Sequence, residues 1–407
     1  MKPALTAYIG VSAAYWSFML TDGALRMLVL FHFHGLGYSA IELAFLFLLY
    51  EVAGIITNLS AGWIAARFGL ASTLFAGLIL QIVALVMLVP FADQAGIALS
   101  LFYVMCAQGL SGVAKDLTKM SAKSSIKSLV PDQDGQLFRW VALLTGAKNA
   151  IKGLGFFVGA ALLASIGFKA SLASMAAALT IIFLLLMFKL PRALPQGKKD
   201  AKFKDVFSQN SHVNWLSLAR VFLFAGRDVW FVVALPIFLF TQVYAILGVK
   251  TDAFFAVGAF MAIWVIGYGY VQARAPKWLG ADVKASHRLV GMAAPWAFAL
   301  ASLQLFLGGW VAVDPNPSLL LICLGLFAFG GVFAINSSLH SYLIIAFAGA
   351  GRTSLDVGFY YMANAAGRFV GTLASGICYY YGGLAPSLLL SGLFVLVSAL
   401  AARKLNH

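Results

Sequence analysis

The sequence predicts an all-α membrane protein with about twelve membrane-spanning helices, arranged as two six-helix halves around a central cavity. Three observations predict this fold class. The chain of 407 residues is 62% hydrophobic and only 10% charged, against roughly 25% charged residues in soluble domains. Apolar runs recur along it, each close to the roughly 20 residues that cross a bilayer. The longest polar connection falls at its midpoint.

Apolar runs broken by glycine, proline or charge define the expected spans in chain order. The first, 6–34, carries Asp22 and Arg26 and is too long for the core of a signal peptide, so we expect it to be retained. The others are expected at 40–65, 70–90, 97–119, 138–163, 168–189, 213–240, 252–273, 288–312, 318–347, 355–380 and 385–402.

The connection after the sixth span divides the chain. It is basic and contains Pro191 and Pro195. We therefore expect an N-terminal six-helix bundle at 1–190, a cytoplasmic linker at 191–212 and a C-terminal six-helix bundle at 213–407.

The two halves show weak internal symmetry. A shift of 216 residues superposes Lys152 on Arg368, Gly155 on Gly371 and Gly167 on Gly383. Two related halves around a central site are expected of a carrier that works by rocking one half against the other.

Basic residues predict the orientation, because they concentrate in the loops that follow the even-numbered spans. The opposite loops hold only Lys169 and Lys250. By the positive-inside rule both termini are cytoplasmic, and we expect a multi-pass protein of the bacterial inner membrane. The net charge of +14 is then explained by topology, so no nucleic-acid partner is expected.

Six cations lie within the expected spans, where each costs roughly 2.5–3.5 kcal/mol at a helix centre. They are Arg26, Lys148, Lys152, Arg220, Arg227 and Arg368. Facing lipid together they would cost on the order of 15–20 kcal/mol, so they must face a wet cavity or a partner.

A cationic stripe extends this set, because Lys115, Lys119, Lys123 and Lys127 repeat every four residues from the fourth span into the next loop. Lys123 and Lys127 are typical topology anchors. Lysine and arginine outnumber the acids, so the cavity should prefer an anion, with Asn149 and Asn364 as neutral donors or, alternatively, contacts between helices.

The acidic candidates for proton coupling or ion pairing are Asp22, Glu51 and Asp228, and His340 is a further titratable candidate. Two local pairs are equally open as packing devices, since Asp22 lies four residues before Arg26 and Asp116 three residues before Lys119.

Other chemistries find little support. Cys106, Cys323 and Cys378 have no paired spacing, so neither a disulfide framework nor a metal site is indicated. His32 and His34 face different sides of a helix. No phosphate-binding loop motif occurs. We expect no cofactor, no metal and no enzymatic activity.

Two sets of motifs resemble known families. Between the second and third spans the chain reads GWIAARFG at 62–69, which is similar to the loop signature of the major facilitator superfamily and implies a gating loop at Gly62, Arg67 and Gly69. That signature normally has an acid where Ala66 stands. The span-four arginine of the family is replaced here by Met105.

More specific strings resemble the ArsJ family of organoarsenical efflux permeases. They are TDGALRM at 21–27, SGVAKDLTKMSAKSSIKSLVPD at 111–132, RWVALLTGAKNAIKGLGFFVG at 139–159, FLFAGRDVWF at 222–231 and YYMANAAGRFVG at 360–371. The resemblance implies the major facilitator fold, export of 1-arseno-3-phosphoglycerate, resistance to arsenate, and a functional partnership with the glyceraldehyde-3-phosphate dehydrogenase that makes this compound.

The sequence leaves several alternatives open. A cationic cavity does not by itself distinguish an arsenate ester from a sugar phosphate or glycerol phosphate, so an antiporter for such an ester is the main alternative. The three cysteines suggest a thiol site for trivalent arsenic, although an arsenate ester is a hard oxyanion better served by lysine and arginine. Proton exchange, phosphate exchange and the membrane potential all remain possible driving forces. We expect a monomer in the bilayer.

Overall fold

The computed structural model describes residues 2–90, 97–129, 136–189, 208–280, 286–314, 316–348 and 353–406. Within these ranges the backbone is helical apart from short turns, and no strand occurs. The helices are α1 (Lys2–Gly35), α2 (Ala40–Phe68), α3 (Leu70–Leu88), α4 (Ile97–Leu129), α5 (Gln136–Lys189), α6 (Ser211–Phe231), α7 (Ala234–Leu247), α8 (Lys250–Trp278), α9 (Ser286–Val313), α10 (Leu319–Phe347), α11 (Thr353–Gly382) and α12 (Leu384–Arg403).

Apart from 213–240, every predicted span coincides with one of these helices or with part of one, and the predicted all-α membrane fold is confirmed. Among the described residues, eight helical stretches are long and apolar enough to cross a membrane by length and composition alone. One of them, Ala147–Phe188, contains both the fifth and the sixth predicted spans. The helices outside this set are α1, α4 and α11, which carry charged residues in their interiors, including Asp22, Lys115 and Arg368.

A glycine with positive φ separates the last two spans of each half. Gly167 has φ 75° and interrupts α5, so the continuous assignment hides two spans that meet at a kink. Gly383 has φ 72° and separates α11 from α12. Side chains other than glycine rarely adopt this left-handed conformation. The predicted correspondence between these two glycines therefore has a structural basis, since both make the same kind of turn.

The predicted span at 213–240 is broken into α6 and α7. Pro236 lies at the start of α7, and a proline ring clashes with the carbonyl four residues earlier and donates no hydrogen bond, which breaks a continuous helix. Ser375 of α11 satisfies the break, because its Oγ accepts hydrogen bonds from the backbone N–H of Val233 at 3.2 Å and of Ala234 at 3.1 Å.

α4 is longer than predicted. The helix continues beyond the expected end at 119 to Leu129, so the lysines at 115, 119, 123 and 127 do follow a helical repeat. The side chains of Lys123 and Lys127 lie outside the described residues. The predicted linker at 191–212 is described only from residue 208.

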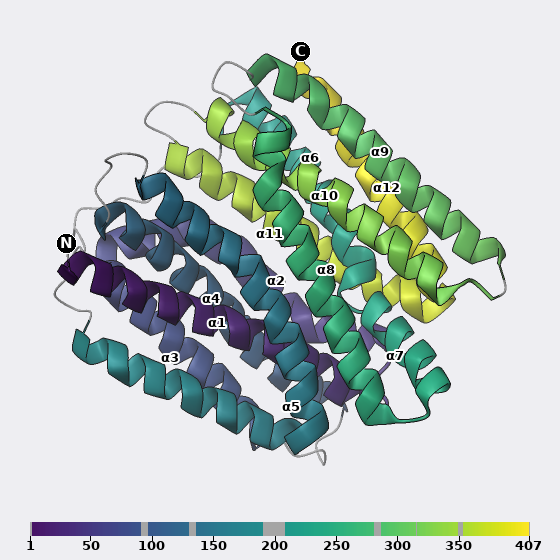
Figure 1. Ribbon diagram of the computed structural model, residues 1–407, viewed down its shortest axis with the longest axis horizontal. Helices are drawn as coiled ribbons and strands as arrows, with labels where there is room; N and C mark the ends of the chain where they lie inside the picture. Colours follow the sequence, from purple (N-terminus) through teal and green to yellow (C-terminus); the bar gives the residue numbers. More distant parts are fainter. Residues whose placement is uncertain are drawn as a thin grey trace.

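Two bundles stand side by side in Figure 1, one formed by α1–α5 and the other by α6–α12. Between them α2 packs on α11, and α5 packs on α8. The internal symmetry pairs the second span with the eighth and the fifth with the eleventh, so it exchanges these two contacts. Both termini lie at the same end of the helices (Figure 1), as an even number of crossings requires.

An aromatic cluster joins the two bundles near the opposite end of the helices. The ring of Phe31, near the end of α1, lies 5.0 Å from that of Phe254 on α8 and 5.8 Å from that of Phe240 on α7, between centroids. Phe240 stacks on Phe254 at 4.9 Å. All three side chains are buried. The halves are therefore closely packed at this end. The cavity described below is lined by other residues.

Candidate functional site

A cavity of about 480 Å³ lies between the two bundles. Its wall is built from α1, α2, α4 and α5 on one side and from α6, α8, α10 and α11 on the other. All ten side chains predicted to bind substrate line it, and they are Arg26, Lys115, Lys119, Lys148, Asn149, Lys152, Arg220, Arg227, Asn364 and Arg368. Positions spread over more than 340 residues of sequence are thus brought to one space.

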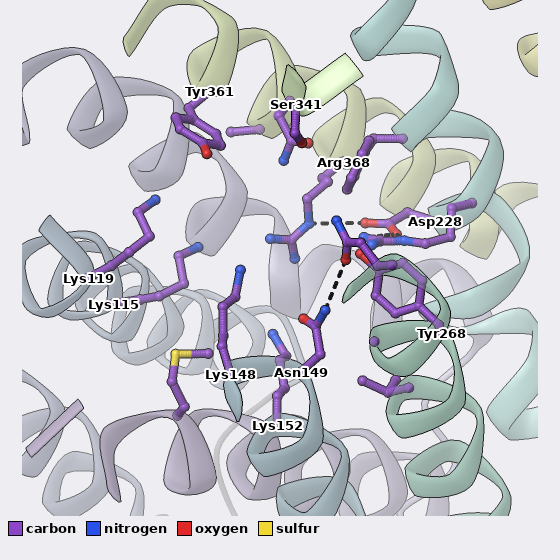
Figure 2. Close-up of a pocket in the computed structure, with 18 of the residues that line it drawn as sticks. Lys115, Lys119, Lys148, Asn149, Lys152, Asp228, Tyr268, Ser341, Tyr361 and Arg368 are labelled. Atoms are coloured by element: carbon purple, nitrogen blue, oxygen red, sulfur yellow. Dashed lines mark hydrogen bonds and ion pairs between the residues drawn. The ribbon is translucent and has the colours of Figure 1, made fainter. Parts of the chain in front are cut away.

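The lysine wall consists of Lys115 and Lys119 from α4 and Lys148 and Lys152 from α5. Figure 2 shows these four side chains extending into the cavity, with Arg368 and Asp228 across from them. Because lysines four residues apart share a helix face, each helix presents two amino groups in the same direction.

Two of these lysines are paired with buried acids. The Lys152 Nζ lies 3.1 Å from Asp22 Oδ2, while the Tyr50 hydroxyl donates to the other carboxylate oxygen at 2.6 Å. The Lys119 Nζ lies 2.5 Å from Asp116 Oδ1. The predicted local pair of Asp116 with Lys119 is therefore confirmed.

Lys115 is stabilised differently. Its Nζ lies 4.0 Å from the centroid of the Tyr50 ring, a cation–π contact worth roughly 0.5–2 kcal/mol. Among the described residues it forms no ion pair with a carboxylate.

Three arginines of the cavity, Arg26, Arg227 and Arg368, form a continuous chain of ion pairs with two carboxylates. Glu51 Oε1 accepts from Arg26 at 3.1 Å and from Arg368 at 2.6 Å. Arg368 also donates through Nε to Asp228 Oδ2 at 3.2 Å, and Arg227 lies 2.5 Å from Asp228 Oδ1. The chain crosses from α1 and α2 to α11 and α6, so it links the two halves.

Arg220 is held mainly by neutral groups and is buried at 4% exposure. Its Nε donates to Asn364 Oδ1 at 2.9 Å and its NH1 donates to Ser337 Oγ at 3.1 Å. Its guanidinium lies 4.0 Å from the ring centroid of Phe224. Within the described part of the chain this arginine has no carboxylate partner, so its charge is available to an anion.

The cavity carries a net positive charge. Eight cationic side chains line it, against two carboxylates in the wall, Asp116 and Asp228, and two directly behind it, Asp22 and Glu51. The described residues therefore leave an excess of four positive charges around one space. Such an excess in a partly enclosed site attracts a multiply charged anion.

Two further predictions concern the pairing of Asp22 with Arg26 and the role of His340. The local pairing of Asp22 with Arg26 is wrong, because these residues instead contact Lys152 and Glu51 across helices. His340 is fully buried and does not line the cavity. Neither of its ring nitrogens has a hydrogen-bond partner within the described structure. It is behind the cavity wall rather than in contact with a solute.

The predicted gating loop is described only in part. Gly62 and Arg67 lie in α2 and their side chains fall outside the described residues. Gly69 has φ 86° and precedes α3, a backbone conformation that favours glycine. The tight turn between the second and third spans therefore depends on this glycine.

Several polar residues of the cavity were not predicted from the sequence. Asn58, Tyr268, Gln272, Ser341 and Tyr361 all line it. Each is a single uncharged polar residue in an apolar span, a pattern that equally fits a contact between helices. Only the packing of α2, α8, α10 and α11 around the cavity shows that these side chains face it.

The three cysteines do not gather in this site. Cys106, Cys323 and Cys378 are all free thiols, and none lines the cavity. Among the described residues no group of three or more histidine, cysteine, aspartate or glutamate side chains is arranged to hold a metal ion.

Comparisons with known proteins agree with this architecture. A family model described as Major Facilitator Superfamily matches residues 7–343. Among solved structures, the fold is similar to a POT family transporter in complex with 5-aminolevulinic acid (TM-score 0.72, 13% identity, 98% of this chain and 96% of that one). It is also similar to the inward open conformation of the xylose transporter XylE from E. coli (TM-score 0.68, 13% identity, 98% and 95%). A D-xylose-proton symporter gives a TM-score of 0.68 at 15% identity, with 98% and 96% covered. No curated protein sequence matches the chain.

Proposed function

This chain belongs to the major facilitator superfamily and is a transport protein rather than an enzyme, and we propose that it exports 1-arseno-3-phosphoglycerate from the cytoplasm. Transport proceeds by alternating access, in which the two halves rock around the central cavity. Export of this compound confers resistance to arsenate, and it depends on a glyceraldehyde-3-phosphate dehydrogenase that supplies the cargo.

The observation that carries the proposal is the charge of the cavity. A phosphate monoester carries about −1.5 to −2 charges at neutral pH, and an arsenate ester is chemically similar. A molecule with one such group at each end therefore matches the excess of four positive charges described above. A neutral sugar gives no reason to bury so many cations, since each costs free energy to place in a membrane.

The distribution of these cations fits a cargo with two anionic ends. Lys148 and Lys152 lie on α5 with Arg26 on the neighbouring α1, and Arg220 and Arg227 lie across the cavity on α6. We assign one oxyanion to each group, with Arg368 completing the arginine side. Arginine binds tetrahedral oxyanions through paired N–H groups, whereas lysine acts as a mobile point charge.

The proposal also includes the location and orientation of the protein. We place it in the bacterial inner membrane as a monomer with both termini in the cytoplasm, because basic residues favour that side. The aromatic cluster around Phe31 closes the opposite end of the cavity. The cavity in this arrangement faces the cytoplasm, where an exporter loads its cargo.

Arsenate resistance tests the proposed cargo. Cells lacking their own arsenic efflux systems express this chain with or without the dehydrogenase, and growth is measured under arsenate and, separately, under arsenite. We expect resistance to arsenate only when both proteins are present. Resistance to arsenite alone would favour a thiol site, and no resistance would favour an antiporter for another phosphate ester.

Two charge variants test the proposed site in the same cells. Lys148→Gln and Arg227→Gln are expected to abolish efflux while the protein still inserts in the membrane. Lys277→Gln is the matched control, because Lys277 is exposed and lies outside the cavity. Normal efflux by both cavity variants would contradict the assignment.

A further inference from the structure

A pair of neutral amides bridges the two halves within the cavity. Asn149 of α5 donates through Nδ2 to Gln272 Oε1 of α8 at 3.1 Å, a contact drawn as a dashed line from Asn149 in Figure 2. Gln272 in turn donates through Nε2 to Ser337 Oγ at 3.3 Å. Both amides line the cavity and are half-buried.

The pair lies between the two cationic groups. Asn149 directly follows Lys148 and lies one helical turn before Lys152. At the other end, Ser337 accepts hydrogen bonds from both Gln272 and Arg220. A hydrogen-bonded path therefore runs from the lysine-bearing α5 to Arg220, and the two amides line the same cavity as both cationic groups.

Hydrogen-bonding capacity is left over on both side chains. A primary amide offers one oxygen acceptor and two N–H donors. Asn149 Oδ1 accepts no hydrogen bond from any described residue, and only one of the two N–H groups of Gln272 is used. The pair thus keeps one unused acceptor and one unused donor, and a hydroxyl group can satisfy both because it donates one hydrogen bond and accepts others.

The backbone is adapted to bring these amides together. Gly269 precedes Gln272 by less than one turn, and a Cβ at that position would lie 2.7 Å from the Cβ of Asn149. Any larger residue would therefore push α5 away from α8. The close approach that lets Asn149 reach Gln272 depends on the absence of a side chain at this point.

We infer that Asn149 and Gln272 form a hydroxyl-recognition pair, which selects oxyanions bearing a hydroxyl on the carbon between their two charged ends. The hydroxyl donates to Asn149 Oδ1 and accepts from Gln272 Nε2. This inference deepens the proposed function and rests on its two-ended anion site. It does not depend on arsenic, because the hydroxyl belongs to the carbon skeleton.

Two stable analogues test the pair by isothermal titration with the purified full chain in lipid nanodiscs. The first is 3-phosphoglycerate, and the second is 3-phosphopropionate, which keeps both anionic ends and lacks the hydroxyl. We expect 3-phosphoglycerate to bind at least about tenfold more tightly, because the absence of the hydroxyl in the second analogue leaves two polar groups of the protein without partners. Gln272→Met should bring this ratio close to one.

Gln304→Met is the matched control. Gln304 is fully buried on α9 and does not line the cavity, so the ratio should stay at its original value in this variant. Equal affinities for the two analogues, or an unchanged ratio in Gln272→Met, would overturn the hydroxyl pair while leaving the anion site in place. Binding of neither analogue would overturn the proposed anion site and the pair together.

Discussion

Glu51 supports two arginines from different halves of the protein, and its neutralisation is therefore a sensitive test of the ion-pair chain. Its side chain is fully buried, while the side chains of Arg26 and Arg368 are 7% and 14% exposed. Glu51→Gln removes the negative charge and leaves two nearly buried guanidinium groups facing each other across one neutral oxygen.

The structure sets the expected size of the effect. Removal of one partner from a buried ion pair costs about 3–5 kcal/mol, because the remaining charge is left without compensation. Both arginines also line a wet cavity, where water and salt reduce this cost. Arg368 keeps its contact with Asp228 at 3.2 Å. We therefore expect a loss of about 2–4 kcal/mol in the free energy of unfolding.

Phosphate should restore much of this stability in the variant. A ligand at 100 times its Kd stabilises the native state by about 2.7 kcal/mol, and a free oxyanion in the cavity compensates the charges of Arg26 and Arg368, which both line it. The assay is thermal unfolding of the purified protein in detergent, with and without phosphate at constant ionic strength. Tm should fall in Glu51→Gln and rise with phosphate by more than in the unmodified chain.

Glu42→Gln is a matched control on the same helix. Glu42 lies at the start of α2 and accepts hydrogen bonds from the backbone N–H and the hydroxyl of Ser39, each at 2.7 Å. Glutamine can maintain this capping arrangement, so Tm should change little. A Glu51→Gln variant with unchanged Tm and no response to phosphate would refute the view that Glu51 compensates these arginines.

Three further predictions concern packing, backbone satisfaction and the thiols. Gly155→Ala should lower the free energy of unfolding by several kcal/mol, because the added Cβ would overlap the backbone of α1, and thermal unfolding measures this loss. Gly309→Ala is the control, since open space surrounds that position, and it should be neutral or stabilising by up to about 1 kcal/mol. Ser375→Ala should cost about 1–3 kcal/mol in the same assay by leaving the amides at the α6–α7 break without an acceptor, whereas Ser165→Ala on an exposed surface should have little effect. Replacement of all three cysteines by alanine should leave arsenate resistance intact, and loss of resistance in a correctly inserted variant would revive the thiol site.

Much of the fold is determined by features that are local in the sequence. A helix that crosses a membrane must satisfy its own backbone hydrogen bonds, so each apolar run of sufficient length predicts a span without reference to the rest of the chain. The sequence did not predict the break between α6 and α7 within 213–240, although Pro236, which lies just after it, is a strong local signal. The residues on both sides of the break form one continuous apolar stretch, Ser211–Leu247, so they were predicted as a single span.

The membership of the cavity was also predictable in large part. Charged residues within apolar spans are too costly to face lipid, and this argument alone selected Lys148, Arg220 and Arg368, which all line the cavity. The same argument has no force for neutral side chains. Gln272 was therefore missed, since a single amide in a span equally fits a contact between helices.

The sequence by itself determined most of the helices, the correspondence of Gly167 with Gly383, and the concentration of positive charge inside the protein. Apart from the local pair of Asp116 with Lys119, only the tertiary structure decided which of these charges meet. Asp22 contacts Lys152 rather than the nearby Arg26, and Glu51 contacts Arg368 across 317 positions of sequence. The reason is physical: burial cost is a property of each residue alone, whereas an ion pair depends on distances between helices that only their packing sets.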